Sequence, residues 1–248
     1  DRIVVVLESK VFVYNFADLQ LLDQIETVYN PKGLCALCPR EHAPVLACPG
    51  RKLGYVHVEL YHIKQSVEVA AHNTALCQIA LNLEGTLLAT ASEQGTLIRV
   101  FDTTDNGRKL HEFRRGVNKA EIYSIAFNAS STFLCVSSDK GTIHIYALLP
   151  QEASPTEQLG LDSKSGNRQS SLVMFKNYLP SYFSSEWSLA QFWVPDSQCI
   201  CAFGADGNSV IAVCANGSFF KLSFDPEKGG EAKQEGYARF LRDASEEI

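Results

Sequence analysis

A short turn sequence recurs at a fixed distance in the middle of the chain. Residues 91–96 read Ala-Ser-Glu-Gln-Gly-Thr, residues 137–142 read Ser-Ser-Asp-Lys-Gly-Thr, and the two segments lie 46 residues apart. Asn82 and Asn128 keep the same offset. A fixed period of this length is typical of architectures that repeat one supersecondary unit, because each unit buries its apolar face only against its neighbours. The repeat therefore indicates a fold assembled from copies of one unit.

Short apolar runs of five to eight residues flank these turns, and Gly, Asn, Asp or Pro separates the runs. Such runs are typical of β-strands, and no convincing long helix is predicted. We expect one four-strand unit and the start of a second at 76–82, 86–92, 96–102, 109–115, 122–128, 132–138 and 142–148. Looser units are expected at 3–7, 10–16, 19–27, 33–38, 44–48, 54–60 and 66–71, and at 197–203, 209–214, 218–224 and 236–241.

The length of the repeated unit indicates which all-β fold this is. Four strands in about 40 to 45 residues are characteristic of a β-propeller blade. The sequence thus predicts an all-β, WD-repeat-like β-propeller with four fairly complete blades and a first blade that lacks its innermost strand. Because the chain opens on Asp1 inside a strand-like run without an initiator Met, we interpret residues 1–248 as a single propeller domain that is incomplete at its N-terminus.

One insertion breaks the repeat, at about 149–184. Its first part is rich in Ser, Pro and Gly without apolar periodicity, which predicts a long mobile loop. Its second part, 172–183, carries many large apolar and aromatic residues. An exposed aromatic patch marks an interaction surface, whereas the same residues could simply pack against a strand at 188–194. We expect 178–183 to be docked in this way and the part before it to be free.

Charge and hydropathy exclude several functional classes. The net charge is −6 and the isoelectric point is about 5.5, so bulk attraction to nucleic acid or to an anionic membrane is not expected. No run of eighteen apolar residues is present. An anion must therefore bind at a specific site, through local positive groups and a shape that fits it.

The 8 cysteines lie mostly in strand-like runs, which predicts reduced, buried thiols. Cys35 and Cys38 have the spacing of a zinc or redox pair, but no second pair follows. Residues i and i+3 of a strand also face opposite ways. We therefore predict no metal and no cofactor.

Arg114 and Arg115 give the strongest functional signal, at the end of a strand-like run that Gly116 closes. Successive side chains of a strand leave on opposite faces, so the two arginines would serve two clefts. The planar guanidinium binds phosphate through parallel charge-assisted hydrogen bonds. The alternative is an exposed pair that forms salt bridges with nearby carboxylates.

The run Phe-Arg-Arg-Gly at 113–116, with 89–101 before it and 138–146 after it, closely resembles the PROPPIN or WIPI family of WD-repeat phosphoinositide effectors. The segments 30–35, 199–204 and 237–241 resemble the branch with the third and fourth human members. The resemblance covers the whole chain. It implies a seven-bladed propeller of which this chain has about the last five blades.

The resemblance also implies a function. Family members bind phosphatidylinositol 3-phosphate and phosphatidylinositol 3,5-bisphosphate at two head-group sites on one rim. They are cytoplasmic proteins that associate peripherally with phagophore, autophagosome, endosomal or vacuolar membranes. There they recruit autophagy machinery, often with a lipid-transfer protein as partner.

The family's site residues can be assigned to this sequence by position. The resemblance implies a first cleft with Arg114, His72, Ser92, Thr96 and Arg99, and a second cleft with Arg115, Ser138, Thr142 and His144. Hydroxyl, imidazole and guanidinium groups all suit phosphate oxygens. Each residue also has a plain structural interpretation: the serines as turn residues, the threonines as β-branched strand starters, and the histidines as satisfied strand residues.

The insertion occupies the place of the family's membrane-contacting loop. Glu152, Glu157 and Asp162 make its first half acidic as well as polar, which disfavours deep insertion. The resemblance leaves a shallow membrane contact through Leu172, Val173, Met174 and Phe175.

Two alternative functions can be set against the sequence. No nucleophile elbow, zinc-protease signature, P-loop or glycine-rich dinucleotide turn is present, so we predict that the protein is not an enzyme. A protein-interaction propeller whose rim arginines bind an acidic peptide motif is the remaining alternative. The sequence leaves open which phosphoinositide is preferred, whether both clefts are occupied, and which proteins bind.

Overall fold

The computed structural model describes residues 2–38, 40, 42–148, 185–195 and 198–241, and strands form all of the regular secondary structure in these residues. The predicted all-β class is therefore confirmed for the described residues. Within them, no helix exists that could cross a membrane. The chain forms two compact units, Asp1–Leu110 and His111–Ile248, and each is described by itself.

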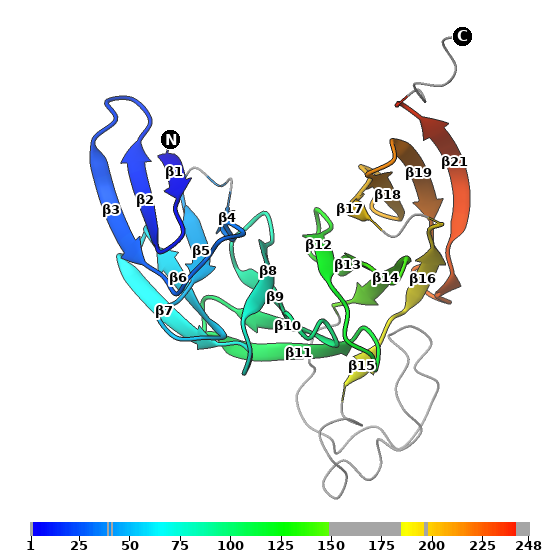
Figure 1. Ribbon diagram of the computed structural model, residues 1–248, viewed down its shortest axis with the longest axis horizontal. Helices are drawn as coiled ribbons and strands as arrows, with labels where there is room; N and C mark the ends of the chain where they lie inside the picture. The colour runs from blue at the N-terminus through cyan, green and yellow to red at the C-terminus, as the bar shows by residue number, and fades with distance from the viewer. Residues whose placement is uncertain (1, 39, 41, 149–184, 196–197, 242–248) are drawn as a thin grey trace, which may run out of the picture. The chain divides into compact units, whose positions relative to one another are not determined.

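The first unit contains three sets of antiparallel strands (Figure 1). The first is β1-β2-β3 and the second is β4-β5-β6-β7. In the third, β9 pairs with both β8 and β10. The strands are β1 (Arg2–Val6), β2 (Lys10–Asn15), β3 (Leu21–Glu26), β4 (Ala36–Leu37), β5 (Val45–Pro49), β6 (Tyr55–Leu60), β7 (Gln65–Ala70), β8 (Leu76–Leu81), β9 (Leu87–Ser92) and β10 (Leu97–Asp102).

The second unit has two sheets, in the orders β12-β13-β14-β16-β20 and β17-β18-β19-β21. The strands are β12 (Ile122–Phe127), β13 (Phe133–Ser138), β14 (Thr142–Ala147), β16 (Ala190–Trp193), β17 (Cys199–Phe203), β18 (Ser209–Cys214), β19 (Ser218–Ser223), β20 (Gly230–Glu231) and β21 (Lys233–Arg239). Strand β11 (Arg108–Arg114) crosses the boundary between the units, and its end pairs in parallel with β15 (Glu186–Trp187).

Two short parallel pairings were not predicted from the sequence. Phe113 lies opposite Glu186, and Ala190 lies opposite Gly230. Both pairings join segments that are distant in the chain and only two residues long. Such short segments show no apolar periodicity from which a strand could be predicted. The predicted interaction of 178–183 with a strand lies outside the described residues, as does the whole insertion 149–184.

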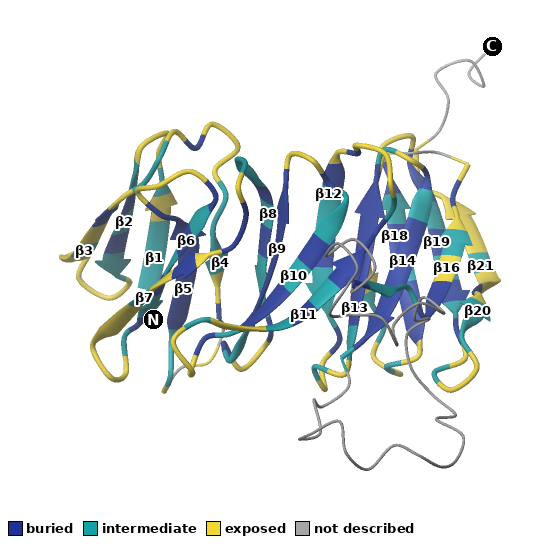
Figure 2. Ribbon diagram, turned by 90° about the horizontal axis from the view of Figure 1, so that it is seen from below, coloured by how far each residue is buried: buried dark blue, intermediate teal, exposed yellow. Residues whose placement is uncertain are grey.

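Each core lies between successive sheets. One cluster joins β2 and β3 to β5 through residues such as Val11 and Leu46, and another joins β5 and β6 to β9 through residues such as Val58 and Leu88. In the second unit, Cys135, Ile145 and Val210 belong to the largest cluster. Figure 2 shows that strands in the middle of a sheet are more buried than edge strands: β13 and β14, in the middle of one sheet, are dark blue, and β21, at the edge of the other, is mostly yellow. Burial on both faces explains why β13 begins with four consecutive apolar residues, Phe133 to Val136.

The repeated asparagines have a structural role. Asn128 is 3% exposed, and its Oδ1 accepts hydrogen bonds from the backbone N–H groups of Thr132 (2.8 Å) and Phe133 (2.9 Å). Its Nδ2 donates to Thr132 Oγ1 at 3.0 Å. Asn82 makes the equivalent bonds to Leu87 N and Thr86 Oγ1. The side chain satisfies backbone donors that the β-turn leaves unpaired, so each asparagine fixes the first hairpin of its repeat.

We expect Asn128→Ala to destabilise the second unit by about 1–3 kcal/mol, since buried backbone donors lose their acceptor. Denaturant unfolding measures this free energy. The matched control is Asn208→Ala, at an exposed turn residue of the same unit, for which we expect less than about 0.5 kcal/mol. Equal effects of the two substitutions would contradict the structural role of Asn128.

Candidate functional site

Arg114 is the last residue of β11, and Arg115 follows it immediately. Each exposes only 6% of its surface. Both arginines are therefore buried, which contradicts the alternative interpretation that they form an exposed pair. The extended run predicted to end at Arg115 ends one residue earlier, at Arg114.

The two guanidinium groups have different surroundings. Arg114 Nη2 donates to Ser185 Oγ at 3.2 Å, and the Arg114 carbonyl accepts a hydrogen bond from the Tyr146 hydroxyl at 3.2 Å. Arg115 Nη2 instead donates to the carbonyl of Asn118 in the turn that follows. Burial lowers the pKa of Arg115, partly opposed by Tyr146 and Asp139. A negative charge near a buried cation stabilises its charged form, as Asp139 does for Arg115.

The second predicted cleft falls within the second unit. Ser138 ends β13 and Thr142 begins β14, so the two hydroxyl residues flank one hairpin turn. His144 lies two residues after Thr142, on the same face of β14. Gly141 closes the turn with a φ of 71°, a conformation that glycine adopts without strain.

His144 connects this group to Arg115 electrostatically. It is 8% exposed, and its Nδ1 lies 3.2 Å from Ser188 Oγ. Burial, followed by the positive charge of Arg115, lowers the pKa of His144 to about 4. At neutral pH this imidazole is therefore uncharged, and it can offer a hydrogen bond to a phosphate without adding charge.

The residues predicted for the first cleft, other than Arg114, lie in the first unit. His72 Nε2 lies 3.0 Å from Thr90 Oγ1, and Arg99 Nη1 donates to the Ala71 carbonyl at 2.6 Å. Arg99 is also directly opposite Thr90 in the β9–β10 register. Ser92 ends β9 and is 6% exposed, and Thr96 precedes β10 in the turn. Because Arg114 belongs to the second unit, its place beside these residues stays a prediction.

Sequence reasoning missed four polar residues that surround the predicted ones. Thr90 is fully buried between His72 and Arg99, and the signal for it was a hydroxyl inside the otherwise apolar run of β9. Tyr146 is also fully buried, and nothing in its apolar strand distinguished it from a core aromatic. Ser185 and Ser188 follow the insertion. Their contacts with Arg114 and His144 depend on long-range strand pairings that cannot be predicted from the sequence.

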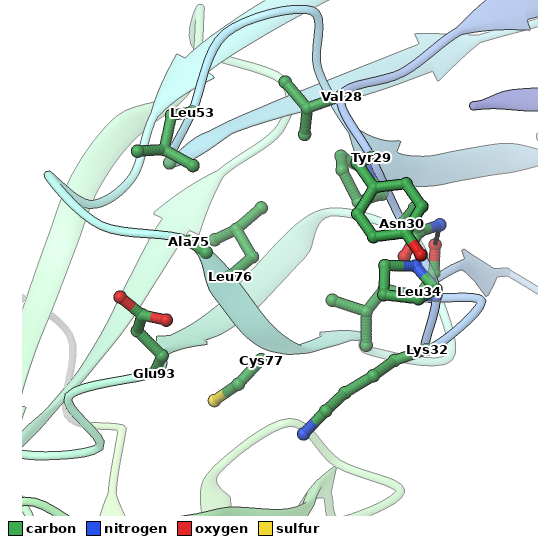
Figure 3. Close-up of a pocket in the computed structure, with 13 residues that line it drawn as sticks. Val28, Tyr29, Asn30, Lys32, Leu34, Leu53, Ala75, Leu76, Cys77 and Glu93 are labelled. Atoms are coloured by element: carbon green, nitrogen blue, oxygen red, sulfur yellow. Dashed lines mark hydrogen bonds between the residues drawn. The ribbon is translucent and has the colours of Figure 1, made fainter. Parts of the chain in front are cut away.

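The structure also contains an apolar cavity of about 440 Å³ in the first unit, and none of the predicted site residues lines it. Its walls include Val28, Leu34, Leu53 and Leu76, and Figure 3 shows Lys32 and Glu93 on either side of Cys77 at one end. A phosphate head group does not suit walls of this kind. The candidate anion site therefore stays at the buried Arg114 and Arg115, and not at this cavity.

In the described part of the chain, no group of three His, Cys, Asp or Glu residues is arranged to hold a metal ion. Cys38 Sγ donates to the Leu83 carbonyl at 3.1 Å, and burial raises the pKa of Cys35 to about 11. All 8 cysteines are thiols, and all but Cys35 are buried. The predicted membrane-contact residues Leu172, Val173, Met174 and Phe175 lie outside the described residues.

A family model described as PROPPIN matches residues 1–234. The chain is 40% identical over 233 residues to autophagy-related protein 18e of Arabidopsis thaliana, covering 93% of this chain and 59% of the relative. It is 35% identical over 242 residues to WD repeat domain phosphoinositide-interacting protein 2 of Xenopus laevis, covering 93% and 55%. The chain therefore spans less than two thirds of the length of these relatives.

Solved structures with a similar fold are known. Hsv2 of Kluyveromyces lactis superimposes with a TM-score of 0.70 at 22% identity, covering 97% of this chain and 71% of that one. A complex of KlAtg21 with the coiled coil of AgAtg16 gives a TM-score of 0.71 at 23% identity, covering 97% and 68%. At these identities the similarity establishes the fold alone, and it confirms the predicted β-propeller class.

Proposed function

Because the chain belongs to the PROPPIN family, we propose that it binds phosphoinositides on membranes through Arg114 and Arg115 and recruits autophagy machinery to them. The ligands are phosphatidylinositol 3-phosphate and phosphatidylinositol 3,5-bisphosphate. The protein is a peripheral membrane scaffold and not an enzyme. A lipid-transfer protein of the autophagy machinery is a partner of the whole protein.

The observation that carries this proposal is the environment of Arg115. Arg115 is 6% exposed and lies within electrostatic range of the neutral His144 and of Asp139, in the turn that Ser138 and Thr142 flank. The carboxylate of Asp139 already favours the charged form of Arg115, and a phosphate would act on it in the same direction. A phosphate monoester supplies two negative charges and three acceptor oxygens, which suit a guanidinium fork, hydroxyl donors and an imidazole N–H.

The Arabidopsis and Xenopus relatives support the same function by their names, which refer to autophagy and to phosphoinositide interaction. The acidic overall balance of the chain argues against a simple electrostatic attachment to anionic membranes. The specificity for phosphoinositides must therefore come from the buried arginines and their neighbours. The competing function, an arginine rim that binds an acidic peptide motif, would use the same two arginines.

Vesicle flotation tests the proposal. The chain is mixed with phosphatidylcholine vesicles that contain phosphatidylinositol 3-phosphate, the 3,5-bisphosphate, the 4-phosphate or no phosphoinositide. We expect flotation only with the two lipids phosphorylated at position 3. Equal flotation with the 4-phosphate would contradict a shaped site, and absence of flotation with every lipid would contradict membrane binding by this chain.

A further inference from the structure

Two cysteines face each other across the first hairpin of the last sheet. Cys199 begins β17 and Cys214 ends β18, and they are direct partners in the antiparallel register. The next pair outward is Gln198 and Ala215, whose backbones are joined by a hydrogen bond from Ala215 N to Gln198 O at 2.8 Å. Hydrogen-bonded and non-hydrogen-bonded pairs alternate along an antiparallel ladder. Cys199 and Cys214 therefore occupy a non-hydrogen-bonded pair.

This position brings two thiols within disulfide range. The Cα atoms of a non-hydrogen-bonded pair are about 4.5 Å apart, and their side chains leave the sheet on the same side. Disulfides form when the Cα atoms are about 4.4–6.8 Å apart. Both side chains point into the core cluster of the second unit, and each cysteine is 3% exposed.

We propose that Cys199 and Cys214 are a modification site, at which a hydroperoxide converts the two thiols into a reversible cross-strand disulfide. One cysteine, as its thiolate, attacks a peroxide oxygen and becomes a sulfenic acid. The second thiol then attacks that sulfur, forms the S–S bond and releases water. For hydrogen peroxide, the two thiols lose two electrons and two protons, and the peroxide is reduced to two water molecules.

The location of the cysteine pair near the end of the hairpin allows a peroxide to reach the thiols slowly. Gln198, Ala215 and Asn216 at this end of the hairpin are exposed, so a local opening of the ladder uncovers both thiols. Burial is the main cause that raises the pKa of Cys199 to about 12, so little thiolate is present while the hairpin is closed. We therefore expect the two thiols to be oxidised over minutes to hours, which is slower than the reaction of a fast peroxide sensor.

A neighbouring thiol could compete for the oxidant. Cys201 lies two residues further along β17, opposite Ala212, and its Sγ is 3.3 Å from Ser124 Oγ. A hydrogen bond with Cys135 is the main cause that lowers the pKa of Cys201. However, Cys201 has no cysteine opposite it in the β17–β18 ladder. The experiment must separate a Cys199–Cys214 bond from a Cys135–Cys201 bond.

Differential alkylation makes this separation. The full chain is treated with hydrogen peroxide and then unfolded in denaturant, where its remaining thiols are blocked with iodoacetamide. The sample is then reduced and labelled with N-ethylmaleimide before peptide mass spectrometry. We expect the maleimide label on Cys199 and Cys214 together, with no label on either before the peroxide treatment. Cys201→Ser should leave this result unchanged. Cys214→Ser should abolish the label that dithiothreitol uncovers on Cys199.

Thermal unfolding gives an independent measurement on the unmutated chain. The oxidised protein should melt several degrees higher than the reduced protein, and dithiothreitol should reverse the shift, because the bond restricts the unfolded chain. A label on Cys135 and Cys201 instead would overturn the proposal. Irreversible oxidation of Cys199 without Cys214, or no modification of either residue, would also overturn it.

Discussion

Arg114→Thr combined with Arg115→Thr is expected to lower the affinity for vesicles containing phosphatidylinositol 3-phosphate by on the order of 100-fold or more. Each charge-assisted contact to a phosphate contributes about 1.5–3 kcal/mol, and about 1.4 kcal/mol corresponds to a factor of ten. Two such contacts are lost. Flotation over a range of lipid concentrations measures the change.

The matched control removes two cations that belong to no predicted cleft. Arg108 pairs with Asp105 at 2.6 Å, and Lys221 pairs with Glu235 at 3.3 Å, both on the surface. Arg108→Thr with Lys221→Thr changes the net charge by the same amount as the test variant. We expect a change in affinity of less than about threefold, because surface pairs and distant charges contribute little. Equal losses for both double variants would show that bulk charge, and not the arginine pair, holds the membrane.

The stability of the second unit is expected to fall by up to about 3 kcal/mol as the pH is lowered from about 6.5 to about 4. His144 is the cause, because its folded-state pKa is about 4 whereas the ordinary value is 6.5. Above pH 6.5 the imidazole is neutral in both states, and the fold bears no penalty. Between the two values the unfolded chain gains a proton that the folded chain excludes, so stability is lost as the pH falls.

His144→Gln should remove this part of the pH dependence and keep a hydrogen-bonding side chain beside Ser188. Denaturant unfolding at a series of pH values provides the measurement. Arg115→Thr should raise the pKa of His144, since the neighbouring positive charge contributes to its depression. An unchanged pH dependence in His144→Gln would show that other groups cause the acid destabilisation.

The repeated turns explain why the strands could be predicted. Gly95 and Gly141 adopt positive φ values of 60° and 71°, and Asn82 and Asn128 hold the hairpins through local hydrogen bonds. Because these interactions involve residues only a few positions apart, a single sequence contains them. The branch of the family that the resemblance suggests and the blade count stay predictions.

The site could be predicted only in part, because its contacts are long-range. The arginines were singled out from the sequence itself, whereas Ser138, Thr142 and His144 were assigned through the family resemblance, and all of these assignments stay predictions. The burial of Arg115 could not be found, since it depends on how the turn after β11 and the neighbouring sheet pack. Ser185 reaches Arg114 from a position 71 residues away, after the insertion. No local pattern encodes such a pairing.

Calorimetric titration with the soluble head group inositol 1,3-bisphosphate tests the central claim most directly, because it removes the membrane and its charge. The unmutated chain should bind the head group, Arg115→Thr should eliminate the cleft that contains Ser138, Thr142 and His144, and the double variant should bind none. The stoichiometry should therefore decrease stepwise from the unmutated chain to the double variant. Unchanged binding by a folded double variant would contradict the assignment of the arginine pair as the phosphoinositide site.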